Sequence, residues 1–416
     1  MRNFLNYQGN KNRLLDFIDT YLPHYFQPGK CFLDIFSGGA SISNHYYNKI
    51  SMISNDIEIY SYHLSNAIYS QGKRFFDTEW KTKFKNDYLQ NFYMLENIYK
   101  DLLEEENKYI NNKDVNNLIK LYSRIPTIWN NLYSEITKTN LVWKDLINVP
   151  FYCLMTTHYS TSYFGLLQSI ELDSIKFAID STVSDYNTSY LYSVLYGVMS
   201  QSVFSKDGHM AQPLSLEKNK NRLLKCRTIK IFDLFEKGIS DYNPETPVFQ
   251  NEALNKELSV ILQDETLLDN IGCIYADPPY TDMQYSRYYH LLTTITKYQY
   301  CEPTIKYGKI TSGLYLNNRI QSSLSTRKNC LNELKKLMLI CKKKRINLCI
   351  SFAYPDEISN EKNDRYTMNI NDLISSCQDI FSETNVEIEK KTYEHANHRN
   401  SSKKKVFEYL ICCRGE

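Results

Sequence analysis

A short apolar run that stops at an acid and two prolines constrains the fold of this chain more than any other feature. The run Ile274–Ala276 leads directly into the sequence Asp277, Pro278, Pro279 and Tyr280. An apolar run of this length that ends at proline is typical of a buried strand in a parallel sheet. Because proline fixes φ and has no N–H to donate, the turn is stiff and holds Asp277 and Tyr280 in set positions. We therefore expect a functional site just past the carboxyl end of this strand.

The chemistry of this turn suits a planar ring that carries an amino group. Such a ring, lying on Tyr280, could present its amino group to the carboxylate of Asp277. A nucleobase is a ring of this kind. The alternative is a strand followed by a turn whose Asp277 does no more than cap the next helix.

Length and composition indicate a chain that can bury a large core. It has 416 residues, of which 42% are hydrophobic and 14% aromatic, which suits one catalytic domain and a second lobe. No long apolar window or hydrophobic signal core is present, so we expect a cytoplasmic protein without a membrane segment. The eleven cysteines contain no Cys-x-x-Cys pair, so we expect no metal site and no disulfide framework. The net charge of +2 is only weakly basic, so phosphate binding would need local clusters of positive charge.

Two further stretches carry ligand-binding patterns. Near the amino terminus, Gly9 would let the backbone approach a ligand, and Lys11 could donate to a carboxylate, although a glycine turn before a helix is also ordinary. Cys31–Phe36 predicts a second buried strand, followed by a tight turn over Ser37–Ser41 that opens a helix. Glycines at the carboxyl edge of such a strand commonly hold adenosine cofactors. About twenty residues later, Asp56 follows another apolar run and could accept ribose hydroxyls, or it could simply cap a helix.

Together these motifs resemble those of DNA N6-adenine methyltransferases that use S-adenosylmethionine. The stretch from Asp277 to Leu291 is similar to the fourth catalytic motif and the helix that follows it in this family. The order also fits the group in which the cofactor motifs precede a target-recognition insertion, and the insertion precedes Asp-Pro-Pro-Tyr. The resemblance implies an α/β fold, with a Rossmann-like class I methyltransferase sheet and a large, mainly helical insertion. A parallel sheet that finishes in an antiparallel hairpin is the family's variation on the doubly wound sheet.

The resemblance also assigns roles to residues of this chain. It implies catalysis at Asp277, Pro278, Pro279 and Tyr280, and contacts with S-adenosylmethionine at Tyr7, Gly9, Lys11, Asp34, Phe36, Gly38, Gly39, Asp56 and Glu252. Glu252 resembles the family's third motif, which reads the adenine amino group of the cofactor, although Asp is more common there. Ala40 departs from the family pattern, because it stands where the last glycine of the turn is common.

The middle of the chain has a different character and divides the sequence into two parts. Residues 76–247 are rich in Lys, Glu and Asn with apolar residues at helical spacing, which predicts a helical insertion and a candidate target-recognition region. Residues 1–75 and 248–416 would form the catalytic domain. Candidate contacts to DNA phosphates are Lys220, Arg222, Arg227, Arg287, Arg319 and Arg399. The alternative for the basic run near 220 is a solvated helix face, and we interpret His290 as a structural residue rather than a general base.

The sequence therefore predicts a site-specific adenine methyltransferase that acts on double-stranded DNA in restriction-modification or phage defence. A cognate restriction nuclease or another defence subunit is a candidate partner. Two alternatives remain, which are methylation of adenine in RNA and a non-catalytic nucleic-acid-binding subunit with the same fold. Cytosine N4 transfer is disfavoured, because enzymes with that chemistry usually have Ser where Asp277 stands.

Overall fold

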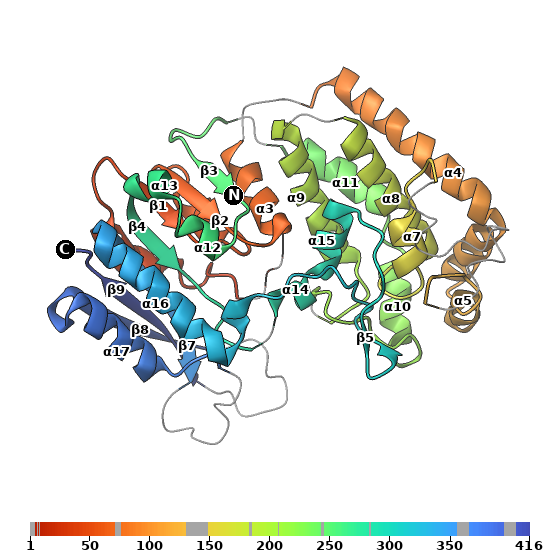
Figure 1. Ribbon diagram of the computed structural model, residues 1–416. Helices are drawn as coiled ribbons and strands as arrows, with labels where there is room; N and C mark the ends of the chain where they lie inside the picture. The colour runs from red at the N-terminus through yellow and green to blue at the C-terminus, as the bar shows by residue number, and fades with distance from the viewer. Residues whose placement is uncertain are drawn as a thin grey trace. The chain divides into compact units, whose positions relative to one another are not determined.

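The computed structural model describes residues 5, 7, 9–70, 76–129, 149–182, 185–206, 208–242, 245–282, 284–355, 366–394 and 405–416. The chain forms two compact units (Figure 1). The sheet unit comprises Gly9–Tyr69, Pro247–Tyr285 and Ile320–Glu416, and the helical unit comprises Met1–Gln8, Ser70–Thr246 and Ser286–Arg319. Residues 286–319, which fall within the catalytic domain predicted from sequence, thus pack with the helical unit.

The sheet unit is built on a seven-stranded sheet in the order β3-β2-β1-β4-β7-β9-β8. Strands β1 (Cys31–Asp34), β2 (Met52–Asn55), β3 (Glu252–Leu254), β4 (Ile271–Ala276) and β7 (Asn347–Pro355) are parallel. Strand β9 (Lys405–Cys413) pairs antiparallel with both β7 and β8 (Val386–Glu394). This sheet, with a parallel body and a terminal antiparallel hairpin, confirms the predicted fold class.

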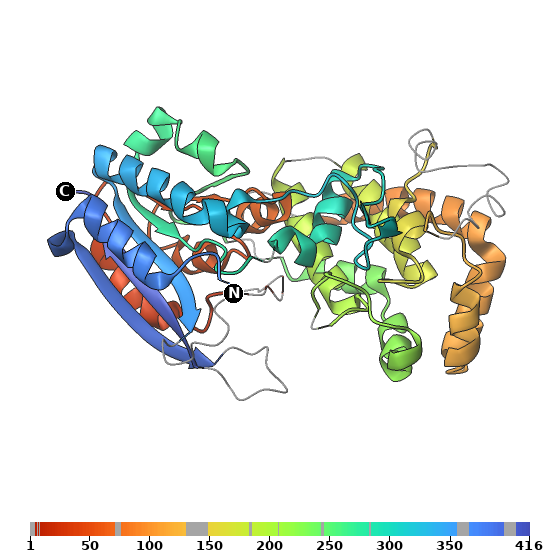
Figure 2. The same cartoon turned by 60° about the horizontal axis from the view of Figure 1, so that its bottom comes forward.

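Helices cover both faces of this sheet (Figure 2). On one face, α12 (Leu258–Ile261), α13 (Glu265–Asp269), α16 (Arg327–Lys344) and α17 (Ile370–Phe381) share a hydrophobic core with strand residues such as Ile274 and Ile350. On the other face lie α1 (Leu15–Tyr21), the 3-10 turn η1 (Leu22–Tyr25), α2 (Ser41–Tyr46) and α3 (Ile59–Tyr69). There Phe32 of β1 packs edge-on against Tyr46, with 5.6 Å between ring centroids. Burial on both faces explains why every residue of β4 and β7 is buried and why apolar residues dominate both strands instead of alternating with polar ones.

Two further 3-10 turns, η4 (Ser323–Ser325) and η5 (Glu383–Asn385), lead into α16 and β8. Helix α16 ends at Lys344, and Arg345 takes the left-handed conformation that terminates it. The three lysines of its last turn complement the helix dipole, so this basic run needs no partner to explain it.

The helical unit is mainly α-helical, as predicted for the insertion. Its elements are α4 (Thr78–Asn111), α5 (Val115–Tyr122), α7 (Leu154–Tyr159), α8 (Leu166–Ser181), α9 (Asp185–Ser202), η3 (Glu217–Asn219), α10 (Lys220–Arg227), α11 (Ile231–Ser240), α15 (His290–Lys297) and a small hairpin of β5 (Ile305–Lys306) and β6 (Lys309–Ile310). The short helix α14 (Tyr285–Tyr288) begins at the last residue of a sheet-unit segment. Within the helical unit, α4, α5, α8 and α10 share one apolar core that includes Leu95, Leu118 and Leu223. None of the described helices is long and apolar enough to cross a membrane.

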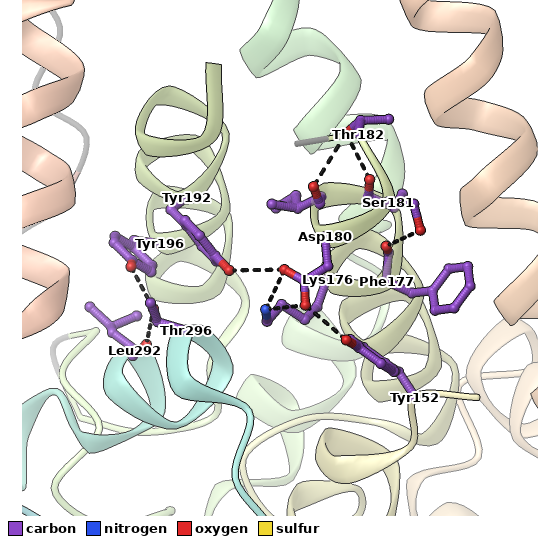
Figure 3. A network of polar contacts seen from close by, with 12 residues as sticks. Tyr152, Lys176, Phe177, Asp180, Ser181, Thr182, Tyr192, Tyr196, Leu292 and Thr296 are labelled. Carbon is purple, nitrogen blue, oxygen red and sulfur yellow. Dashed lines mark hydrogen bonds and ion pairs between the residues drawn. The ribbon is translucent and has the colours of Figure 1, made fainter. Parts of the chain in front are cut away.

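Buried charges brace the helical unit from inside. Lys176 of α8 is almost fully buried, and its ammonium lies 2.5 and 2.6 Å from the two carboxylate oxygens of Asp180, one turn later (Figure 3). The hydroxyls of Tyr152 and Tyr192 also donate to Asp180, and Figure 3 shows both rings beside this pair. Burial lowers the pKa of Lys176, whereas Asp180 raises it and so favours the charged form. The hydrogen bond from Tyr192 links α9 to this pair on α8.

Candidate active site

The turn after β4 is held firmly in the sheet unit. β4 ends at Ala276, so Asp277 begins the turn at the carboxyl edge of the parallel strands. Thr367, on the segment that leads into α17, pins the turn by two hydrogen bonds. Its amide donates to the carbonyl of Tyr280 at 3.0 Å, and its hydroxyl donates to the carbonyl of Pro279 at 2.8 Å. Neither bond uses the carbonyl of Pro278.

The amino-terminal glycine and lysine meet this turn. The ammonium of Lys11 lies 2.9 Å from Oδ1 of Asp277, and the Lys11 side chain is only 5% exposed. Gly9 has φ of +86°, and a Cβ there would lie 3.3 Å from the hydroxyl of Tyr280 and 3.2 Å from that of Tyr285. Only glycine adopts this conformation without strain and also leaves room for both tyrosines. The structure thus brings Gly9, Lys11, Asp277 and Tyr280 together.

The glycine turn after β1 forms a second side of the site. Gly38 has φ of +48°, and its amide donates to Oδ2 of Asp56 at 2.9 Å. Ala40 adopts the left-handed conformation with φ of +60° and precedes α2, so the turn keeps the shape that glycine would give it. The sequence departure at Ala40 therefore changes the residue but not the turn, at some cost in backbone strain.

The carboxylates at this edge carry more negative charge than nearby cations balance. Burial, and then the neighbouring Asp277 and Asp56, raise the pKa of Asp34 well above its usual value. Burial raises the pKa of Asp56 to about 6, against hydrogen bonds from the amides of Glu58, Gly38 and Ile57. Burial also raises the pKa of Asp277 to about 6, although Lys11 favours its ionised form. Within the described residues, neither oxygen of Asp34 accepts a hydrogen bond of normal geometry, although the nearby Phe36 amide weakly favours its ionised form.

Burial of carboxylates without full pairing is costly, and a cationic ligand would offset that cost. Lys11, by contrast, stays charged. Burial alone would lower its pKa, but the attraction of Asp277 and a second acid, Glu408, raises it well above the usual value. The site therefore suits a ligand that brings positive charge to Asp34 and Asp277.

Comparison with known families decides the assignment. A family model described as D12 class N6 adenine-specific DNA methyltransferase matches residues 7–309, which include the amino-terminal glycine, the glycine turn and the turn after β4. The chain belongs to this D12 class.

Two curated proteins with low sequence identity to this chain are also named as methylases or methyltransferases. The chain is 22% identical over 306 residues to "Modification methylase LlaI" of Lactococcus lactis subsp. lactis, which covers 73% of this chain and 40% of that protein. It is 23% identical over 316 residues to "Type II methyltransferase M.FokI" of Planomicrobium okeanokoites, which covers 76% of this chain and 40% of that protein. The chain thus spans about two fifths of the length of these relatives.

Membership of the D12 class implies a methyl donor, and the geometry fits a cationic one. The orphaned oxygens of Asp34 and the turn at Gly38 are polar groups that a bound donor would engage. Gly39 and Phe36 flank this turn, and Phe36 is half-buried against the core of the sheet unit. Among the described residues, no group of three His, Cys, Asp or Glu side chains is arranged to hold a metal ion.

Two further residues of this D12-class chain, Glu252 and Tyr7, were also predicted to contact the cofactor. Glu252 is the exposed first residue of β3, at the amino end of that strand, whereas Asp34 and Asp277 lie at the carboxyl ends of β1 and β4. Pairing of β3 with β2 starts at Glu252. Tyr7 belongs to the helical unit, where its ring stacks on Tyr289 with centroids 4.8 Å apart.

The basic residues predicted to bind DNA fall into different environments of the helical unit. Arg227 is only 5% exposed, and its guanidinium donates to the hydroxyl of Tyr122, the side chain of Gln168 and two backbone carbonyls. This interior position leaves Arg227 unable to reach a phosphate, so that expectation was wrong. Lys220 is half-exposed and pairs with Glu217, and Arg222 is exposed and donates to the carbonyl of Ser205.

Two of the remaining arginines share one aromatic ring. The guanidinium groups of Arg287 and Arg319 lie 5.8 and 5.2 Å from the ring centroid of Tyr315, and Arg287 is exposed. Arg399 lies outside the described residues. His290 is buried beside Tyr163 and Tyr315, and burial lowers its pKa to about 3, so it stays neutral as a structural residue would.

Sequence reasoning missed three residues that shape the site. Thr367 pins the turn, Tyr285 lies against Gly9, and Glu408 pairs with Lys11 at 3.0 Å. Only Glu408 had a signal in the sequence. Glu408 shares one face of an apolar strand with Leu410 and Cys412, which lie two and four residues later. A charge on such an inward face needs a buried partner.

Proposed function

We propose that this protein is a site-specific DNA adenine-N6 methyltransferase that uses S-adenosylmethionine and acts on an adenine flipped out of duplex DNA. The observation that carries the proposal is the pairing of Asp277 with Lys11 beside Tyr280, on the sheet edge that also bears Asp34, Gly38 and Asp56. Membership of the D12 class supports it.

The proposed chemistry depends on how the turn presents its acceptors. Adenine N6 is a poor nucleophile because its lone pair is delocalised into the ring. Hydrogen bonds from N6 to Oδ2 of Asp277 and to the carbonyl of Pro278 would favour a more pyramidal nitrogen and would stabilise the charge that develops on it. The ammonium of Lys11 lies nearest to Oδ1 of Asp277, and we assign Oδ2 to the base. The stiff prolines hold both acceptors at fixed positions, which aligns the nucleophile.

The donor side of the site would be held by the groups around the glycine turn. When bound, S-adenosylmethionine supplies the electrophilic methyl group on a positively charged sulfur. Asp34 and Gly38 would contact its amino acid part, and Asp56 would accept its ribose hydroxyls. The adenine of the DNA must leave the duplex, and stacking on Tyr280 would recover about 1–3 kcal/mol of lost base stacking.

Target recognition and biological setting belong to the same proposal. We assign transfer to the sheet unit and DNA contacts to the helical unit, where Arg287 and Arg319 are the strongest remaining candidates. The hairpin of β5 and β6 adds Lys306 and Lys309 on either side of Tyr307, which is fully exposed. The two relatives are named as a modification methylase and a type II methyltransferase, which supports a role for this chain in restriction-modification or phage defence, with a cognate nuclease as a candidate partner.

Transfer of tritium from methyl-labelled S-adenosylmethionine tests the proposal. We expect the full chain to label duplex DNA and to leave RNA unlabelled, and we expect Asp277→Ala to abolish labelling while calorimetry still detects S-adenosylmethionine binding. Asp372→Asn, at an exposed acid of α17, is the control and should label DNA like the unmodified chain. Labelling of RNA instead would favour the RNA enzyme, and failure to bind S-adenosylmethionine would favour a non-catalytic subunit.

A further inference from the structure

A second buried carboxylate holds Lys11 opposite Asp277. The ammonium of Lys11 lies 3.0 Å from Oε1 of Glu408, and the Glu408 side chain is fully buried. The same ammonium lies 2.9 Å from Oδ1 of Asp277. One lysine thus bridges two acids, one at the end of β4 and one within β9.

The position of Glu408 is fixed by the sheet rather than by a loop. Glu408 stands opposite Ala353 in the antiparallel pairing of β9 with β7. The hydroxyl of Ser351, on the neighbouring strand, donates to Oε1 of Glu408. Within the described residues, Oε2 of Glu408 is buried and accepts no hydrogen bond. Burial of an incompletely paired acid is unfavourable, so its presence beside Lys11 calls for a functional reason.

The groups that face Asp277 define what Glu408 changes. They come from the amino-terminal segment, β1, β4, the turn, α14 and β9, and they are Lys11, Asp34, Tyr275, Tyr280, Tyr285 and Glu408. Without Glu408, Lys11 and Asp277 would form a neutral pair, and the flexible lysine could swing across both oxygens of Asp277. With Glu408 on its other side, the ammonium is drawn toward β9, and its short contact with Asp277 is at Oδ1.

We propose that Glu408 is a positioning residue that keeps Lys11 on Oδ1 of Asp277 and so leaves Oδ2 available to the substrate amino group. The inference rests on the proposed function only for the identity of that amino group. The surplus carboxylate also opposes ionisation of Asp277, because two acids then share one cation. A merely structural Glu408, which anchored the β8–β9 hairpin, would affect folding but not the ionisation of Asp277.

Carboxyl titration of the full chain without cofactor or DNA separates these roles. The chain is labelled with ¹³C at the aspartate carboxyl carbon, and Asp277→Asn identifies the signal of that residue. We expect a midpoint of about 6 for Asp277 in the unmodified chain and a lower midpoint in Glu408→Gln, because the amide keeps the shape but removes one negative charge. Glu257→Gln, at an exposed acid of the same unit, is the control and should leave the midpoint unchanged.

Kinetics provide the second readout. In Glu408→Gln we expect kcat to fall by up to about 100-fold, because misplacement of a reacting group can cost that much. We expect little change in KM for S-adenosylmethionine. If Glu408→Gln folds but Asp277 titrates at the unmodified midpoint, or if the variant keeps full kcat, the proposal is overturned.

If Glu408→Gln does not fold, Glu408→Asp replaces it. That shorter acid keeps the charge, so the midpoint should stay near that of the unmodified chain while kcat falls, and an unchanged kcat would again overturn the proposal. The titration needs no methylation, so its result is separate from the fate of the proposed function.

Discussion

Lys11 and Asp277 form a buried ion pair, with 2.9 Å between Nζ and Oδ1, that joins the amino-terminal segment to the end of β4. This single contact brings together two motifs that are far apart in the sequence. In the proposed function it leaves Oδ2 of Asp277 for the adenine. Several expected results follow from this pair and its surroundings.

The rate of methyl transfer should fall as the pH drops through about 6. Transfer requires ionised Asp277, and burial raises the pKa of this acid from 3.8 to about 6. Because the folded state then binds this proton more tightly than the unfolded chain does, the same group makes the cofactor-free protein less stable as the pH rises from 3.8 to about 6. The pH dependence of kcat/KM for S-adenosylmethionine between pH 5 and pH 8 measures the effect, because this ratio reports the pKa of the cofactor-free protein. A rate that stays constant down to pH 5 would contradict it.

Binding of S-adenosylmethionine near pH 6 should release protons. Burial raises the pKa values of Asp34, Asp56 and Asp277, and a bound cation would lower them again. Calorimetry in two buffers of different ionisation enthalpy measures the protons released. S-adenosylhomocysteine, which lacks the sulfonium charge, is the matched ligand and should release fewer. Equal release by both ligands would count against a site tuned to positive charge.

Gly9→Ala should impair both stability and transfer. The positive φ alone costs about 1–2 kcal/mol for an L-residue, and the new Cβ would press on Tyr280 and Tyr285. Because Lys11 is two residues away, its ion pair should shift as well. Gly29→Ala is the control, since Gly29 has φ of +73° but no neighbour within 4 Å of a Cβ. Urea unfolding should show a loss for both variants, whereas methylation should fall only in Gly9→Ala. Full activity of Gly9→Ala would refute this account of the segment.

Some of this site follows from local sequence, and some of it depends on tertiary pairing. The position of Asp277 was predictable, because the apolar run of β4 and the two prolines that follow it are adjacent in sequence and together mark the end of the strand. Glu408 reaches Lys11 only through the pairing of β9 with β7, and no local pattern fixes that register. Arg227 shows the opposite failure. The nearby basic residues Arg222 and Lys225 are exposed, but the side chain of Arg227 turns inward to Tyr122 and Gln168, which belong to other helices.

Asp180→Ala should destabilise the helical unit by about 2 kcal/mol, because it leaves Lys176 buried without its carboxylate. The figure is below the usual cost of breaking a buried pair, since the Asp180 side chain is 35% exposed. Asp87→Ala breaks the exposed pair with Lys83 and should cost no more than about 0.5 kcal/mol. Thermal unfolding of the two variants provides the comparison. Equal losses would show that the Lys176 pair is no more than a surface contact.

The most direct test of the central claim is the identity of the base that carries the transferred methyl group. Duplex DNA from cells that express the full chain is digested to nucleosides and analysed by mass spectrometry, with Asp277→Ala as the paired sample. The account predicts N6-methyladenine within one recurring sequence for the unmodified chain and none for the variant. Methylated cytosine alone, or N6-methyladenine that persists in Asp277→Ala, would contradict it.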